Sequence, residues 1–117
     1  MTAKALETHV RHVSGVAVVD LRGDIDGSAE QALNAAYAEA TANNATSVLL
    51  NFTQVEYINS TGIALIVGLL AQARKAKRAI STFGLSDHYT EIFQITRLSD
   101  FMHIYPDEAS ALSHLPE

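Results

Sequence analysis

The sequence has 117 residues, of which 48% are apolar, and its formal net charge is −5 at neutral pH. This length suffices for one domain with a single buried core, and we expect one domain over residues 1–117. The negative charge argues against nucleic acid or an anionic membrane surface as the main partner, because phosphates attract a basic face. The absence of cysteine excludes disulfides and thiolate chemistry.

No segment of the sequence predicts a signal peptide or a membrane-spanning helix. Residues 1–13 contain no unbroken apolar segment of the kind that forms a signal peptide. The longest apolar stretch, residues 63–73, is about half as long as a membrane-spanning helix. We therefore expect a cytoplasmic protein without membrane insertion.

The first third of the chain predicts two strands and a helix. Residues 6–13 and 16–23 are short segments rich in β-branched residues, and the Ser14–Gly15 pair between them favours a hairpin turn. After them, Ser28 is a suitable N-cap and Asn43–Asn44 a suitable stop. The apolar positions between follow the spacing of a helix with one buried face: Ala29, Ala32, Leu33, Ala36, Tyr37 and Ala40.

The middle third predicts a buried strand followed by a long helix. The apolar residues of segment 47–52 are continuous, as in a strand that is buried on both faces, and residues 53–59 read as a loop. The predicted helix at 60–77 is apolar almost all round, which favours a central helix that packs on the sheet and is covered on its other side. Its expected core residues are Leu65, Ile66, Leu69 and Leu70. The cations near its end complement the helix dipole: Arg74, Lys75, Lys77 and Arg78.

The last third predicts two further strand–helix pairs. Residues 79–84 form a short strand, and residues 86–96 a helix that Ser86 or Asp87 caps. Residues 101–105 form the last strand, and residues 106–115 a helix with proline in its first turn. Strands that alternate with helices imply parallel pairing. The fold class is therefore α/β, with a small mixed β-sheet that begins in an N-terminal hairpin and is covered by about four helices.

The sequence contains few features of a catalytic site. The sequence has no glycine-rich phosphate loop, no dinucleotide-binding motif and no zinc-protease motif. Asp24 and Asp26 lie two residues apart and are candidates for an acid–base pair, but a turn and helix entry explain them more simply. An enzyme would also need a nucleophile, a base and an orienting group that meet, and none do. We therefore expect no catalytic residue, no metal and no cofactor.

The tetrapeptide Asn59-Ser60-Thr61-Gly62 stands where a strand leads into the long helix. A hydroxyl here can cap the free backbone N–H groups, which is the simple interpretation. The same N–H groups and the positive end of the helix dipole can also accept a phosphate on a hydroxyl. Because parallel strands collect their loops at one edge, we expect Asp24, Asp26, Asn59 and Ser60 on one exposed end of the domain.

Three segments in this order and spacing resemble a known family. Residues 21–26, LRGDID, are similar to its L-x-G-[DE]-[IL]-D segment before the first helix. Residues 48–62 resemble its signature strand and loop, which usually ends in D-S-[ST]-G. Residues 84–112 are similar to its tail of short helix, last strand and C-terminal helix. The family is the STAS domain, in its bacterial anti-sigma factor antagonist form.

The resemblance implies a phosphorylation-switched binding protein. The unphosphorylated protein binds an anti-sigma factor that is also a serine kinase, which frees the sigma factor. Phosphorylation of Ser60, or alternatively of Thr61, releases that partner, and a serine/threonine phosphatase resets the switch. The implied partner-binding residues are Asp24, Asp26, Asn59, Ser60, Thr61 and Gly62.

The sequence departs from the family pattern at two places. Asn59 stands where the family usually has aspartate, and residues 77–79 replace a glycine pair that often precedes the fourth strand. Some STAS proteins are constitutive subunits of lipid-transport complexes or stress-sensing assemblies. In that alternative, residues 59–61 only cap a helix. A third alternative, a small enzyme that uses Asp24 and Asp26, lacks a third catalytic group.

Overall fold

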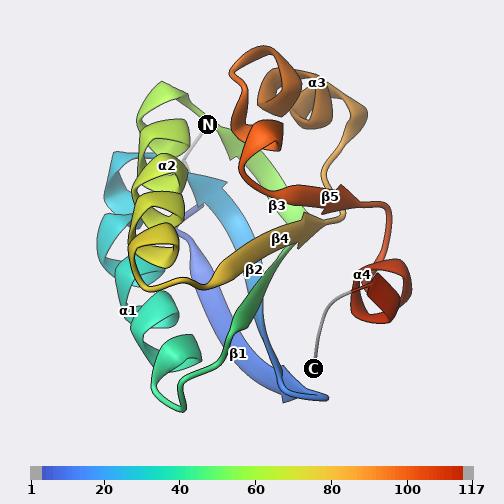
Figure 1. The fold of residues 1–117 in the computed structure, drawn as a ribbon. Coiled ribbons are helices and arrows are strands. Elements are labelled where there is room, and N and C mark those ends of the chain that lie inside the picture. The colour runs from blue at the N-terminus through green and yellow to red at the C-terminus, as the bar shows by residue number, and fades with distance from the viewer. Residues whose placement is uncertain (1–3, 115–117) are drawn as a thin grey trace.

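A mixed five-stranded sheet forms the centre of the protein, whose computed structural model describes residues 4–114 (Figure 1). The strands are β1 (Glu7–Val13), β2 (Val16–Ile25), β3 (Ser47–Ile58), β4 (Ala79–Phe83) and β5 (His103–Tyr105). Their order in the sheet is β1-β2-β3-β4-β5, with β1 antiparallel to β2 and every other pair parallel. The predicted α/β fold with an N-terminal hairpin is therefore confirmed.

Within residues 4–114, four helices and two short 3-10 turns accompany the strands, and the last helix follows the last strand. The helices are α1 (Glu30–Thr41), α2 (Ser60–Lys75), α3 (Asp87–Ile95) and α4 (Glu108–His114), and the 3-10 turns are η1 (Gly27–Ala29) and η2 (Leu98–Asp100). Figure 1 shows α1 and α2 side by side on one face of the sheet and α4 on the opposite side. Within residues 4–114, none of the helices combines the length and the hydropathy that a membrane span requires.

The main core lies between the sheet and the helices α1, α2 and α3. The predicted apolar stripe of α1 is buried there, including Leu33 and Tyr37, and it meets alternate residues of β2 such as Val19. The α3 helix joins the same core through Phe93, whose ring meets that of Phe52 edge to face at 5.9 Å. These contacts explain why the one-sided helical spacing in the sequence is a reliable signal.

The opposite face of the sheet has a smaller core under α4. Ala111 of α4 packs on Val16, Val18, Leu49 and Phe83. An ion-pair network adds to this contact. The guanidinium of Arg11 in β1 reaches Asp20 in β2 at 2.7 Å and Glu108 in α4 at 2.6 Å.

The predicted loop at 53–59 is wrong, because β3 continues to Ile58. Its second half pairs in parallel with the end of β2, from Arg22 opposite Gln54 to Ile25 opposite Ile58; one register shift precedes Arg22 and a second lies between Gly23 and Asp24. This half is mostly polar and exposed, so its strand conformation depends on the backbone hydrogen bonds that β2 supplies. A neighbouring strand that is distant in sequence cannot be read from the apolar pattern alone.

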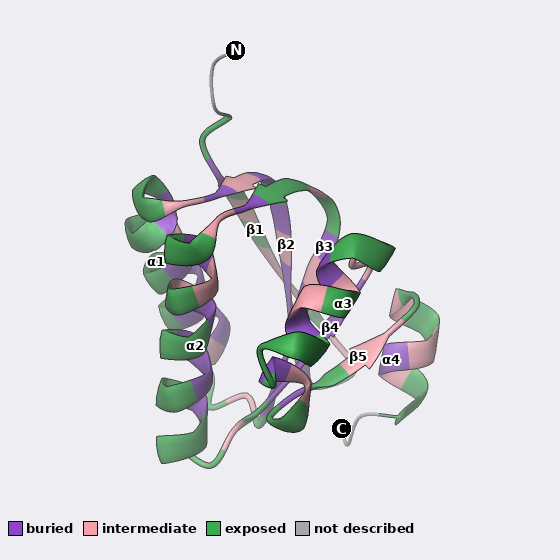
Figure 2. Cartoon of the chain, turned by 90° about the horizontal axis from the view of Figure 1, so that it is seen from above, coloured by how far each residue is buried: buried purple, intermediate pink, exposed green. Residues whose placement is uncertain are grey.

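The prediction that α2 is covered on both sides is also wrong. Ile66, Leu69 and Leu70 are buried as predicted, but Leu65 is only half-buried, and 47% of the neighbouring Val67 is exposed. Figure 2 shows exposed residues along the outer side of α2 and buried ones along its inner side. From Ala64 to Ala71 the outer positions are small or apolar, which gave the helix its all-round apolar composition, but no other element within residues 4–114 covers them.

The ends of the C-terminal elements differ from the prediction by a few residues. Strand β5 begins at His103 instead of 101, and α4 begins at Glu108 after an Asp107 cap that accepts the Ser110 N–H at 2.8 Å. The predicted cap of α3 at Ser86 is confirmed by its bond from the Tyr89 N–H at 3.2 Å. Residues 1–3 and 115–117, which belong to the predicted single domain, lie outside the described part of the chain.

Candidate functional site

The parallel strands β2 and β3 end side by side, and the chain leaves both at the same edge of the sheet. Ile25 lies opposite Ile58 in the register, and the Asn59 N–H donates to the Ile25 carbonyl at 3.2 Å. The segments that follow, residues 26–28 and 59–62, therefore lie next to each other. The structure thus brings Asp26, Asn59 and Ser60 to one end of the domain, as the sequence predicted. Asp24, the fourth residue of that prediction, lies near the end of β2 with its side chain on the other face of the sheet.

Asn59, and not a hydroxyl residue, caps α2. Its backbone is extended, and its Oδ1 accepts the Gly62 N–H at 2.8 Å. The Asn59 carbonyl also accepts the Ile63 N–H at 2.9 Å, which is the first bond of the helix. Because an amide oxygen already satisfies the cap, Ser60 and Thr61 are not needed for it.

Gly62 lets the first turn of α2 lie directly against β2. A Cβ at this position would lie 2.0 Å from the Ile25 carbonyl oxygen, far inside van der Waals contact. Gly62 is buried, and its backbone is in the helical region, so the glycine is required by close approach and not by an unusual backbone angle. The start of α2 is therefore held in place relative to the end of β2.

Ser60 and Thr61 are both exposed in the first turn of α2. Within residues 4–114, neither hydroxyl makes a side-chain hydrogen bond. Thr61 differs from Ser60 in that its methyl group points toward the neighbouring turn: a Cβ at Gly27 would lie 3.6 Å from Thr61 Cγ2. Ser60 thus presents a hydroxyl that is free to react, at the positive end of a helix of 16 residues.

Asp26 caps the turn beside the start of α2. Its Oδ1 accepts the Ser28 hydroxyl at 2.5 Å and the Ser28 backbone N–H at 2.9 Å. These two bonds, the hydroxyl first, hold the pKa of Asp26 below its ordinary value. The predicted N-cap at Ser28 is therefore wrong, since Asp26 accepts the bonds and η1 precedes α1.

Asp24 has a different environment from Asp26. Its carboxylate accepts the Lys4 backbone N–H at 3.1 Å, while its own N–H donates to the Lys4 carbonyl at 3.0 Å. Successive strand residues point to opposite faces, and Ile25 is buried in the main core, so Asp24 points to the other face, next to Tyr57. Asp24 thus holds the segment before β1, whereas Asp26 holds the turn at Ser28, and the two carboxylates do not form an acid–base pair. Among residues 4–114, no three side chains gather that could hold a metal ion.

Two tyrosines belong to this end of the domain and were not singled out in the sequence. The hydroxyl of Tyr89, which is buried in α3, accepts the Ile58 N–H at 2.9 Å and so anchors the last residue of β3. Tyr57 is 52% exposed beside Asp24. Its position in a predicted loop gave no reason to expect a fixed aromatic side chain there. An exposed tyrosine held on a rigid strand is a common feature of protein-binding surfaces.

The protein is thus an α/β domain with a small mixed sheet, helices on both sides and a hydroxyl-bearing helix start at one edge of the sheet. Residues 7–111 match the family model of the STAS domain. The chain therefore belongs to the STAS domain family.

Relatives with established names include two anti-sigma-B factor antagonists. The protein from Listeria monocytogenes is 38% identical over 55 residues, which is 47% of this chain and 48% of the relative. The chain thus matches about half the length of that relative. The protein from Staphylococcus aureus is 28% identical over 86 residues, which is 74% of this chain and 80% of the relative.

Solved structures with a similar fold include an anti-sigma factor antagonist from Mycobacterium paratuberculosis. Its TM-score is 0.80 at 22% identity, over 93% of this chain and 92% of that one. The Bacillus cell fate determinant SpoIIAA in its phosphorylated form has a TM-score of 0.71 at 20% identity, over 94% of this chain and 100% of that one. At these identities, the likeness establishes the fold alone.

Proposed function

We propose that this protein is an anti-sigma factor antagonist, a binding protein and not an enzyme, whose association with an anti-sigma factor is controlled by phosphorylation of Ser60. The partner is an anti-sigma factor with serine kinase activity, which the unphosphorylated protein binds. A serine/threonine phosphatase removes the phosphate. These events take place in the cytoplasm, where sigma factors act.

The observation that supports this proposal most directly is that Asn59, and not Ser60, caps α2. Asn59 caps α2 through its amide oxygen, so the exposed Ser60 hydroxyl is not part of the framework of the fold. A kinase can modify Ser60 without breaking a hydrogen bond that holds the helix. The names of the Listeria and Staphylococcus relatives support the antagonist role, and the phosphorylated form of SpoIIAA provides a precedent for phosphorylation on this fold.

A phosphate on Ser60 would change the surface more than the fold. The first backbone N–H groups of a helix lack partners within the helix, and they and the dipole favour an anion there. The group adds about −1.5 to −2 charges, which a bound partner would have to desolvate. The Asp26 carboxylate on the neighbouring turn would add to the negative charge that a partner meets beside the phosphate. Phosphorylation is therefore expected to weaken partner binding without remodelling the domain.

Asn59 is the one observation that favours the alternative of a constitutive subunit in a lipid-transport or stress-sensing assembly. The STAS signature usually has aspartate here, and the amide keeps the capping geometry while removing a charge next to Ser60. In this alternative, the same end of the domain binds its partner permanently, and Ser60 is never modified.

Phosphorylation in vitro tests the proposal. The protein is incubated with ATP and a candidate anti-sigma kinase, and the modified residue is located by mass spectrometry. We expect modification at Ser60 and none in Ser60→Ala. Thr61→Ala is the matched control: it removes the adjacent hydroxyl and should leave phosphorylation intact.

Calorimetry with the same kinase then measures the effect on binding. Ser60→Ala should bind as the unmodified protein does, and the phosphorylated protein should bind at least about tenfold more weakly, since 1.4 kcal/mol already gives that factor. Ser60→Asp should weaken binding less than phosphate, because it has less charge and fewer acceptor oxygens. Equal affinity for the unmodified, Ser60→Ala and phosphorylated proteins would leave residues 59–62 as a helix cap only.

A further inference from the structure

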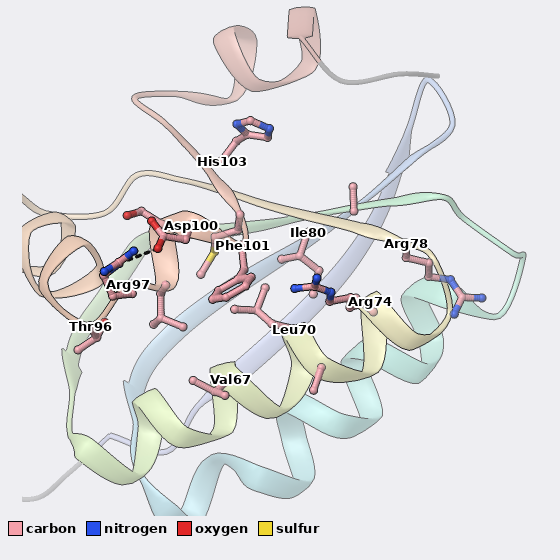
Figure 3. Close-up of a pocket in the computed structure, with 16 residues that line it drawn as sticks. Val67, Leu70, Arg74, Arg78, Ile80, Thr96, Arg97, Asp100, Phe101 and His103 are labelled. Atoms are coloured by element: carbon pink, nitrogen blue, oxygen red, sulfur yellow. Dashed lines mark hydrogen bonds and ion pairs between the residues drawn. The ribbon is translucent and has the colours of Figure 1, made fainter.

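A second, chemically different surface lies between the outer side of α2 and the η2–β5 segment. It is a groove with a volume of about 690 Å³. Figure 3 shows Leu70 of α2 facing Phe101 across this groove, with Val67 one turn earlier on α2. Its floor is apolar and includes Leu70, Ile80 and Met102, all of them buried residues of the main core.

The groove leaves two large apolar side chains in contact with solvent. Phe101 is 58% exposed and Val67 is 47% exposed, although both adjoin the buried core. Surface apolar residues that gather around a concave site indicate a ligand or partner, whereas isolated ones need no explanation. Pockets for small molecules usually measure about 300–1,000 Å³, so the volume of this groove lies within that range.

The charge around the groove is opposite to that of the whole protein. Five of the eight Lys and Arg residues lie at positions 74, 75, 77, 78 and 97, and no Asp or Glu occurs between positions 57 and 86. Arg74, Arg78 and Arg97 line the groove, together with a single acid, Asp100. Asp100 is already paired with Arg97 at 2.7 Å. The helix dipole explains cations in the last turn of α2, but not the apolar hollow beside them.

Arg74 is the residue best placed to bind a ligand head group. Its guanidinium lies over the Phe101 ring, 5.5 Å from the centroid, and makes no ion pair within residues 4–114 (Figure 3). The stacking holds a charged fork at the rim of the apolar floor. A guanidinium presents several N–H donors in one plane, which matches the two oxygens of a carboxylate.

From this arrangement we propose that the groove binds a small amphiphilic anion, a free molecule with a carboxylate head on Arg74 and an apolar body over Leu70, Ile80 and Met102. Arg97 is paired with Asp100, and the Nε–H of Arg78 donates to the Ala45 carbonyl at 3.0 Å, so among the groove arginines of the described residues Arg74 is the one without a hydrogen-bond partner. One such arginine beside a short apolar floor fits one head group on one chain. Nucleic acid would require several phosphate contacts on a broad basic face, and the net charge of −5 opposes that. The site is independent of the proposed switch, because it needs neither Ser60 nor the anti-sigma factor.

Decanoate is a suitable probe, used below its micelle concentration and followed by ¹H–¹⁵N NMR titration. We expect saturable shifts at the backbone amides of Leu70, Ile80, Phe101 and Met102. Decanol and decyltrimethylammonium have the same chain with a neutral or cationic head, and each should bind at least about tenfold more weakly, since a charge-assisted hydrogen bond is lost. Octanoate should bind about tenfold more weakly than decanoate, because each buried methylene contributes a factor of about three to four.

Two variants and a matched control locate the site. Arg74→Gln should weaken decanoate binding at least about tenfold and change decanol binding little. Val67→Glu places a carboxylate at an exposed position beside the floor, where folding tolerates it, and should abolish decanoate binding. Arg22→Gln removes an exposed cation on β2 and should leave the affinity unchanged.

Four outcomes would overturn the inference. The first is equal binding of the three ten-carbon probes, and the second is equal loss of affinity in Arg74→Gln and Arg22→Gln. The third is a set of shifted amides that lies outside the groove. The fourth is binding to anionic phospholipid vesicles, or to an acidic peptide, without any binding of free decanoate, which would assign the groove to a membrane or a protein partner.

Discussion

The first turn of α2 and the outer side of its later turns meet the rest of the protein in opposite ways. At Gly62 the helix backbone touches β2 so closely that a Cβ would lie 2.0 Å from a carbonyl oxygen, whereas at Gly68 a Cβ would meet nothing within 4 Å. The same helix is therefore fixed where it presents Ser60 and open where it borders the groove. A phosphate on Ser60 is therefore expected to change the binding of a partner and not the fold. The uncovered apolar side of α2 is available to bind a ligand.

Breaking the inner contacts of α2 should have the largest effect on stability. Leu69 is 2% exposed in the main core, so Leu69→Ala should lower the free energy of unfolding by roughly 2–5 kcal/mol. Val67 lies on the outer side of α2, where it borders the groove. Val67→Ala should therefore change the free energy of unfolding by less than about 0.5 kcal/mol. Urea unfolding measures both. Similar losses for the two variants would mean that the outer side of α2 is covered in solution.

The two glycines of α2 provide the next test. Gly62→Ala forces the first turn away from Ile25 and should cost about 3 kcal/mol, at the upper end of the usual range for overpacking. Gly68→Ala places a methyl group in open space and should stabilise the helix by about 0.5–1 kcal/mol. Thermal unfolding of both proteins gives the sign of each change. A stable Gly62→Ala protein would contradict the close contact between α2 and β2.

This contrast also shows how far the sequence could predict the fold. The order and type of the elements follow from local patterns: the α1 stripe is buried as its spacing predicts, and α2 begins at Ser60 as predicted. The exposure of the outer side of α2 could not be predicted from the sequence. An apolar composition shows that a helix can be buried on all sides, but it does not show whether another element covers each side. Small residues such as Gly68 add to the apolar count without needing cover.

The candidate site was predicted in position but not in detail. Parallel topology was enough to bring Asp26 and Ser60 to one end, since strand ends meet at one edge. The sequence did not predict that Asn59 caps α2 and that Asp26 caps the turn before α1, because several neighbouring polar residues could take the extended backbone conformation of a cap equally well. The anchoring of Ile58 by Tyr89 joins residues 31 positions apart, which no local pattern encodes.

The cap of α2 should contribute a smaller amount to stability. Asn59→Ala removes the acceptor for the Gly62 N–H and should cost about 1 kcal/mol, within the usual range of 0.5–2. Asn59→Asp retains the acceptor and adds a negative charge at the positive end of the helix, which should stabilise by about 0.3–1 kcal/mol. Denaturant unfolding at neutral pH compares them. Equal stability of Asn59→Ala and the unmodified protein would mean that Ser60 or Thr61 replaces the cap.

The smallest expected effect is the pH dependence of stability, because Asp26 can titrate and the neighbouring cap, Asn59, cannot. The bonds from Ser28 hold the pKa of Asp26 below its ordinary value in the folded protein. Its stabilising contribution is therefore fully present above the unfolded pKa of about 3.9, and it is lost as the pH falls through the folded pKa. The Asn59 amide has no such dependence.

As the pH falls below the ordinary carboxyl pKa of about 3.9, Asp26→Asn should therefore lose less stability than the unmodified protein. The denaturant dependence of unfolding should be similar for the two proteins. The bond to Arg11 also lowers the pKa of Asp20, so the informative quantity is the difference between the two proteins. Ser28→Ala removes the stronger of the two bonds and should reproduce part of that difference. Parallel stability curves for Asp26→Asn and the unmodified protein would show that the Ser28 bonds do not persist in solution, and that the turn beside Ser60 is looser than the cap of α2.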